Sequence, residues 1–278
     1  MIDIRRFALN RIICPALSLE EFFRLAADLG LSKVELRNDL PGGRIVDDLE
    51  PAQAAALAEK HGVRIITINA LQKFNLAAVK ARVAAELEEM LDTAAALRCP
   101  AIVLCPNNDT NDARDAATRL AETAAALSAF GPSFVRRGIL GYVEPLGFAE
   151  CSLPSIVTAA TAIERSGQPC YRTVYDTFHS HLGPDAQSDI GAGYDVSRTG
   201  LIHASGVESA IDRSRYRDEH RVLPGPADRT SCREQIRHHV KLGYAGDISL
   251  EPFAAEVQKL TRAKLADALR ASLEYLRA

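Results

Sequence analysis

The feature that most constrains this chain is a regular alternation of short β-branched runs with longer stretches of helical periodicity. This alternation is typical of consecutive β–α units whose strands form a parallel sheet. Strands are predicted at residues 7–10, 34–36, 65–68, 101–104, 139–143, 171–175, 201–204 and 247–250. No linker or low-complexity stretch interrupts the pattern, so we expect one domain that spans residues 1–278.

Eight strand–helix units in one chain of 278 residues favour a closed barrel over an open sheet. Ser18 and Glu21 form a capping box that opens the first helix, and Gly30 is well placed to end it. A further helix is predicted at 112–130, whereas 184–199 is rich in Gly, Asp and Ser and is predicted to be mostly loop. The glycine-rich phosphate fingerprint of a dinucleotide-binding fold does not follow the first strand. The predicted fold is therefore a single (β/α)₈ barrel, the TIM barrel architecture.

The composition excludes several classes of protein. A net charge of −3 gives no electrostatic reason to expect nucleic acid as a partner. The six cysteines form no C-x-x-C pair, and a chain of this length does not need disulfides, so we expect reduced, structural cysteines. No apolar stretch approaches the ~20 residues of a membrane span, and we predict a cytoplasmic protein without membrane contact. The sequence is compatible with a homo-oligomer.

Ionisable residues lie at the carboxyl ends of the last four predicted strands, where TIM barrels carry their active sites. They are Glu144, Asp176, His203 and Glu251. Three carboxylates so close together would repel one another unless a cation lay between them. Oxygen ligands with one imidazole suit Mn²⁺, Co²⁺, Zn²⁺ or Mg²⁺, so we predict one divalent metal ion.

Each of these residues has a simpler interpretation when it is taken alone. A glutamate at a strand end is often a solvated turn residue, and a lone histidine in a strand is often a satisfied core residue. Their occurrence at equivalent positions of four neighbouring strands favours the functional interpretation. Pro145 and Pro252 follow the two glutamates and favour extended geometry at the strand tips.

Two further segments are unusual as connectors. His179 and His181 follow closely on Asp176, although surface polarity would explain them equally well. The stretch 206–229 is about twice the length at which structureless loops become uncommon, and it contains Arg221. A charge at the rim of the barrel is the alternative interpretation of this arginine.

At these residues the sequence resembles the xylose-isomerase-like barrel superfamily and, within it, the inosose isomerases. The similar stretches are Ile68–Leu71, Phe74-Asn75, Glu144–Gly147, Tyr175–His181, Ile202-His203, Asp218–Gly225, Gly243-Tyr244 and Glu251–Phe253. The resemblance covers most of the barrel and is densest between 140 and 255.

The resemblance implies a role for each candidate. It implies that Glu144, Asp176, His203 and Glu251 bind one divalent ion. It also implies that Glu144 and Glu251 act as acid and base, and that His179 and Arg221 contact substrate oxygens. Glu150 lies six residues after Glu144, a spacing at which a substrate-binding glutamate recurs in ketose epimerases, whereas a glutamine is expected there in inosose isomerases.

The activity implied is isomerisation of a cyclitol ketone, 2-keto-myo-inositol to 1-keto-chiro-inositol, by enediolate proton transfer in inositol catabolism. The partner would be a small-molecule sugar or cyclitol ketone, unphosphorylated because no glycine-rich phosphate loop follows the last two strands. A ketose 3-epimerase, an inosose-type dehydratase, an AP endonuclease and a non-catalytic barrel are the alternatives. The endonuclease is disfavoured because strands two and three end without the additional histidines that a three-zinc cluster needs.

Overall fold

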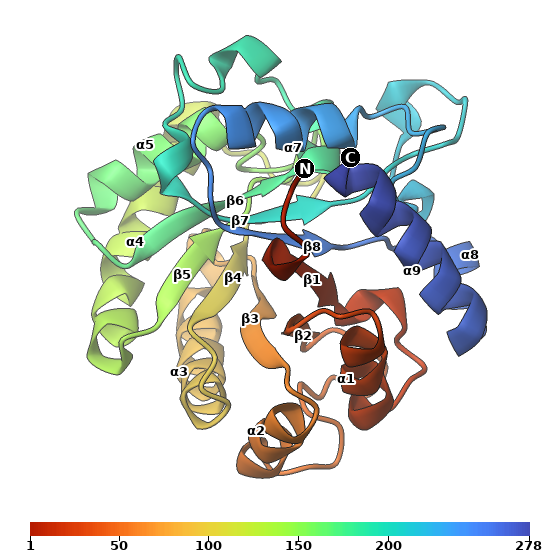
Figure 1. Ribbon diagram of the computed structural model, residues 1–278. Helices are drawn as coiled ribbons and strands as arrows, with labels where there is room; N and C mark the ends of the chain where they lie inside the picture. Colours follow the sequence, from red (N-terminus) through yellow and green to blue (C-terminus); the bar gives the residue numbers. More distant parts are fainter.

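Eight parallel strands close into a barrel in the computed structural model, which describes all 278 residues (Figure 1). The strands are β1 Phe7–Asn10, β2 Lys33–Arg37, β3 Arg64–Gln72, β4 Ala101–Cys105, β5 Leu140–Val143, β6 Tyr171–Asp176, β7 Thr199–Ala204 and β8 Asp247–Leu250. Each strand pairs with its neighbours in the sequence, and β1 closes against β8 where Phe7 lies opposite Ile248. The predicted (β/α)₈ barrel is confirmed.

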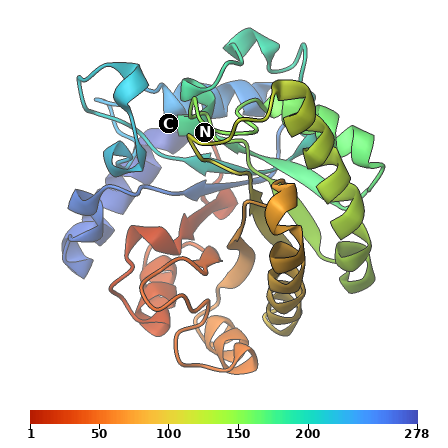
Figure 2. The same cartoon turned by 180° about the vertical axis from the view of Figure 1, so that it is seen from behind.

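Helices surround the strands on the outside of the barrel, as the view from behind also shows (Figure 2). They are α1 Leu19–Asp28, α2 Pro51–Lys60, α3 Lys80–Ala96, α4 Ala116–Arg137, α5 Ile156–Ser166, α6 Thr177–Leu182, α7 Cys232–Lys241, α8 Ala255–Gln258 and α9 Arg262–Arg277. The two termini lie side by side, because the backbone N–H of Ile2 donates to the carbonyl of Arg277 at 3.1 Å. None of these helices combines the length and the apolar character needed to cross a bilayer.

Local sequence signals set several of the boundaries. The capping box of Ser18 and Glu21 is present at the start of α1. Gly30 and Gly62 follow α1 and α2 with φ of 72° and 68°, a left-handed conformation that only glycine adopts without a steric penalty. The six cysteines are buried and free, as expected.

Two elements differ from the sequence-based expectation. Helix α4 begins at Ala116 rather than 112, because the side chain of Asp115 caps it by accepting from the N–H of Thr118, and it ends at Arg137 rather than 130. Strand β3 continues to Gln72 instead of ending at 68. The sixth helix is a single short segment, α6, and 184–199 is mostly loop as predicted.

Two apolar layers result from the alternation of side chains along the strands. On β2, Val34 and Leu36 belong to the large cluster between strands and helices, whereas Glu35 contacts residues of the barrel interior. The apolar part of the interior is small and includes Ala8, Ile66, Val103, Val174 and Leu201. Towards the carboxyl ends of the strands the interior becomes polar, and the candidate site lies there.

A buried histidine outside the site makes stability depend on pH. The ring of His239 in α7 packs against that of Tyr175 at a tilt of 44°, with centroids 3.8 Å apart, and burial lowers the pKa of His239 to about 4 from 6.5. As the pH falls from about 6.5 towards 4, His239 becomes protonated in the unfolded chain but stays neutral in the folded one. The free energy of unfolding therefore decreases over this pH range.

We predict that a His239→Leu variant loses less stability on acidification than the wild type. Since a pKa difference of 2.5 units corresponds to about 3 kcal/mol, the wild type should lose up to about that much more unfolding free energy between pH 7 and pH 4. Urea unfolding of both proteins at the two pH values measures the difference. Equal losses would contradict the neutral, buried state of His239.

Candidate metal centre

Strand ladders bring the four predicted ligands to one end of the barrel. The backbone N–H of Glu144 donates to the carbonyl of Leu104, and that of Glu251 donates to the carbonyl of Ala204, each at 3.0 Å. Both glutamates thus extend the ladder by one residue beyond β5 and β8. Asp176 is the last residue of β6 and lies opposite His203 of β7.

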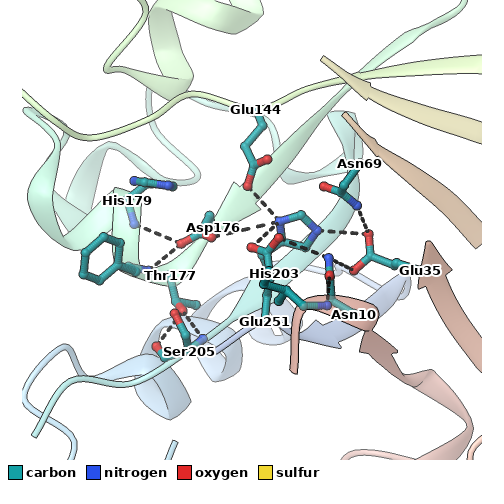
Figure 3. A network of polar contacts seen from close by, with 12 residues as sticks. Asn10, Glu35, Asn69, Glu144, Asp176, Thr177, His179, His203, Ser205 and Glu251 are labelled. Carbon is teal, nitrogen blue, oxygen red and sulfur yellow. Dashed lines mark hydrogen bonds and ion pairs between the residues drawn. The ribbon is translucent and has the colours of Figure 1, made fainter. Parts of the chain in front are cut away.

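The side chains of these residues converge on one point (Figure 3). One ligand atom from each of Glu144, Asp176, His203 and Glu251 lies within 4.8 Å of the others, and all four residues are buried. The Nδ1 atom of His203 is at the centre of the group. It lies 2.7 Å from Glu144 Oε1, 3.1 Å from Glu251 Oε2 and 4.0 Å from Asp176 Oδ2.

The other ring nitrogen of His203 faces a carboxylate that the sequence analysis did not single out. Nε2 lies 3.1 Å from Glu35 Oε2. Burial favours the neutral ring, but the carboxylates of Glu251, Glu35 and Glu144 raise the pKa of His203 well above its usual value. The carboxylates therefore favour a positive charge at the ring, and next to Nδ1 either a proton or a metal ion would supply it. Three carboxylates and one imidazole are a suitable donor set for a divalent cation.

Two buried arginines hold the carboxylates from above. Arg221 Nη2 donates to Asp176 Oδ2 at 2.6 Å and to Glu251 Oε2 at 2.9 Å. Arg37 Nη1 donates to Glu251 Oε1 at 2.6 Å. Burial alone would raise the pKa of Glu251, but His203, Arg221 and Arg37 together hold it well below its usual range. Both guanidinium groups also lie over the ring of Phe253, which fixes their orientation.

Asp176 has a second role, because it caps the helix that carries His179. Its Oδ1 accepts from the backbone N–H groups of Phe178 at 2.7 Å and His179 at 2.9 Å, so α6 begins directly at the site. The ring of His179 packs edge-on against Phe148, with centroids 5.0 Å apart. Its Nδ1 is buried and has no hydrogen-bond partner in the chain. A ligand oxygen would satisfy this nitrogen.

A cavity of about 390 Å³ opens above the candidate ligands. Its lining includes Arg37, Asn69, Glu144, His179, Arg221 and Glu251. The structure therefore brings both predicted substrate contacts, His179 and Arg221, to the same cavity as the two glutamates.

Glu150, the third predicted substrate contact, lies elsewhere. The turn after Gly147 carries it into a neighbouring, more open cavity, where it lies with Asp212 and Arg217. Phe148 lines both cavities and stands between them. Glu150 forms no hydrogen bond or ion pair, and nothing in its surroundings directs it towards the candidate ligands.

The sequence analysis missed residues on the first three strands. Asn10, Glu35, Arg37 and Asn69 are all buried at the carboxyl ends of β1, β2 and β3 and join the network of Figure 3 or its cavity. The signal was available, because each is a polar residue at or near a predicted strand end. A rule based on ionisable strand ends points to Arg37, which directly follows the predicted strand 34–36, but not to the amides Asn10 and Asn69 or to Glu35 in the middle of its strand.

Comparisons with known proteins agree with the barrel fold. The family described as xylose isomerase-like TIM barrel matches residues 23–278. A crystal structure of a xylose isomerase domain containing protein from Salmonella typhimurium LT2 superimposes with a TM-score of 0.93 at 36% identity, over 99% of this chain and 98% of that chain. No curated protein sequence matches the chain.

More distant structures share the fold. The IOLI protein with a bound zinc atom has a TM-score of 0.88 at 18% identity, over 98% of this chain and 97% of that chain. A D-psicose 3-epimerase in the presence of D-fructose has a TM-score of 0.73 at 17% identity, over 98% of both chains.

We predict that Zn²⁺, Mn²⁺ or Co²⁺ raises the unfolding temperature of the metal-free protein, because a ligand of the folded state stabilises it. An Asp176→Asn variant keeps the Oδ1 acceptor that caps α6 but loses the charge, so its affinity for the ion should fall by about tenfold or more. Isothermal titration of the metal into each protein measures the affinity.

Asp115→Asn is the matched control, since Asp115 also caps a helix but lies exposed on the outer ring. It should keep wild-type metal affinity. Unchanged affinity in Asp176→Asn would exclude Asp176 as a ligand.

Proposed function

Because the chain belongs to the xylose isomerase-like TIM barrel family, we propose that it is a metal-dependent isomerase of cyclitol ketones. The reaction would convert 2-keto-myo-inositol to 1-keto-chiro-inositol. The observation that carries the proposal is the pair of buried glutamates, Glu144 and Glu251, which both lie next to Nδ1 of His203 and line one cavity. Moving a carbonyl between adjacent carbons requires two positioned proton carriers and no redox cofactor.

Different residues of the site would bind the metal ion, transfer the protons and bind the substrate oxygens. A divalent ion held by Glu144, Asp176, His203 and Glu251 would supply Lewis acidity towards the oxygens of an α-hydroxy ketone. One glutamate takes the proton from the hydroxyl-bearing carbon and a proton returns to the neighbouring carbon. The hydroxyl proton passes to the former carbonyl oxygen, so that the ketone and the hydroxyl exchange places. His179, whose Nδ1 has no partner in the chain, and Arg221 then bind the oxygens of the enediolate as their negative charge increases.

The charges around the cavity favour a neutral substrate. Arg37 forms two hydrogen bonds of 2.7 Å to Asp39, and Arg221 is engaged by Asp176 and Glu251. Lys73, at the rim, lies 4.0 Å from Asp109. Each cation of the lining thus has a carboxylate partner already. An unphosphorylated polyol ketone is the substrate class that this balance supports.

A ketose 3-epimerase is the second candidate, since it could use the same two glutamates and return the proton to the opposite face of the same carbon. The shared fold of D-psicose 3-epimerase and L-ribulose 3-epimerase, and the spacing of Glu150, favour it. The position of Glu150 in the neighbouring cavity disfavours the epimerase, because the side chain does not line the cavity of the candidate ligands. Product stereochemistry distinguishes the two reactions.

The first test is proton NMR of the metal-loaded protein in D₂O with 2-keto-myo-inositol. We expect a new ketone isomer with deuterium at the exchanged carbon, because the proton passes through a glutamate that exchanges with solvent. If a well-folded, metal-bound protein gave no conversion, the cyclitol proposal would be wrong, and epimerisation of free ketohexoses would be assayed next.

A second prediction concerns the roles of Glu144 and Glu251 in proton transfer. Glu144→Gln and Glu251→Gln should each lower kcat by about 10²–10⁴-fold, the usual contribution of a general acid or base. The measurement is kcat at saturating metal, with bound metal quantified in each variant. Wild-type turnover in both variants with metal bound would contradict the mechanism.

Glu150→Gln provides a matched control with the same chemical change. Because Glu150 lies outside the cavity of the candidate ligands, we expect kcat and KM within about twofold of wild type, the range of a substitution without a specific partner. A large rise in KM would show that Glu150 reaches the substrate after a movement of the turn at 148–150.

A further inference from the structure

We propose that Glu35 is a positioning residue that fixes the ring of His203 so that Nδ1 is free to bind the metal ion. The inference rests on the proposed metal site. Glu35 does not line the cavity, so it acts on the ion through His203 and not on the substrate.

Glu35 is fully buried on β2, on the side of His203 opposite to the metal ligands (Figure 3). Its Oε2 accepts from the hydroxyl of Thr67, from Asn69 Nδ2 at 2.9 Å and from His203 Nε2 at 3.1 Å. Its Oε1 accepts from Asn10 Nδ2 at 3.2 Å. Four donors surround this carboxylate, and none of them is an arginine or lysine.

This environment determines which nitrogen of His203 carries the proton. A carboxylate can only accept, and Oε2 already accepts from Thr67 and Asn69, so the Nε2 atom of His203 that faces it must be the protonated nitrogen. In the neutral ring the lone pair then lies on Nδ1, which faces Glu144 and Glu251. A carboxylate behind a metal-binding histidine also makes the ring a stronger donor.

Asn10 connects Glu35 to a second candidate ligand, Glu251. Its Nδ2 lies 3.2 Å from Glu35 Oε1 and 3.1 Å from Glu251 Oε1. One amide group therefore bridges the carboxylate behind His203 and the glutamate of β8. The positions of two candidate ligands are coupled through the first two strands of the barrel.

The test is the affinity of Glu35→Gln for Co²⁺ and Zn²⁺, measured by competition with a chromophoric chelator. Glutamine preserves the shape and the acceptor oxygen but removes the charge, so we expect a loss of about 10–100-fold in affinity, the usual effect of removing a partner behind a metal ligand. The visible spectrum of bound Co²⁺ should also change, which a remote loss of stability would not cause.

Thr173→Val is the matched control. Thr173 is equally buried in β6, but its hydroxyl interacts with Tyr194 and with the carbonyl of Arg198 at 3.3 Å, away from the ligands. It should lower thermal stability and leave both the affinity and the Co²⁺ spectrum unchanged. Wild-type affinity in Glu35→Gln would overturn the positioning role while leaving the metal site intact.

A second measurement does not depend on the folding of a variant. In the zinc-loaded wild-type protein, a long-range ¹H–¹⁵N correlation should show His203 protonated at Nε2, and protonation at Nδ1 would overturn the proposal. A wild-type protein that bound neither Co²⁺ nor Zn²⁺ would overturn the metal site itself and this inference with it.

Discussion

The repulsion among the carboxylates around His203 is the constraint on which the rest of this site depends. Glu144, Asp176 and Glu251 are buried and place oxygens within 4.8 Å of one another and of Nδ1. Charges that would be screened at a surface interact strongly there, and an uncompensated buried carboxylate is costly. The barrel compensates them from two directions, with Arg37 and Arg221 above the group and the imidazole at its centre. A divalent ion would complete this balance.

The geometry of the strands places the four candidate ligands close together. Asp176 and His203 are register partners on adjacent strands, and Glu144 and Glu251 continue the ladders of β5 and β8 by one residue. Each ligand therefore lies on hydrogen-bonded backbone and not on a free loop, which fixes the positions of the donors relative to one another. The capping of α6 by Asp176 fixes His179 to the same frame, so the metal ligands and the nearest substrate contact share one rigid support.

The sequence predicted the parts of this design that depend on local pattern. The strand–helix alternation gave the barrel, and the strand-end rule located all four candidate ligands. A rule based on ionisable strand ends does not find the amide Asn10 or Glu35 in the middle of its strand, and Arg37 was missed although it directly follows the predicted strand 34–36. The position of Glu150 could not be predicted, because a spacing of six residues says nothing about the direction of the turn after Gly147. The end of α4 at Arg137 was missed since Gly131-Pro132 resembles a stop, yet the helix continues to Gly138, whose φ of 65° ends it.

The two halves of the barrel contribute differently to the chemistry. Strands β5 to β8 supply the groups that would bind the ion and move protons, whereas β1 and β2 supply Asn10, Glu35 and Arg37, which hold those groups in place. The substrate would meet mainly the late loop with Arg221, the short helix with His179 and the rim near Lys73. Substitutions at the floor would disturb the charge balance around His203, whereas substitutions at the rim would leave that balance unchanged. Differences in substrate between members of such a family should therefore arise at the rim, over a floor that keeps the same reaction.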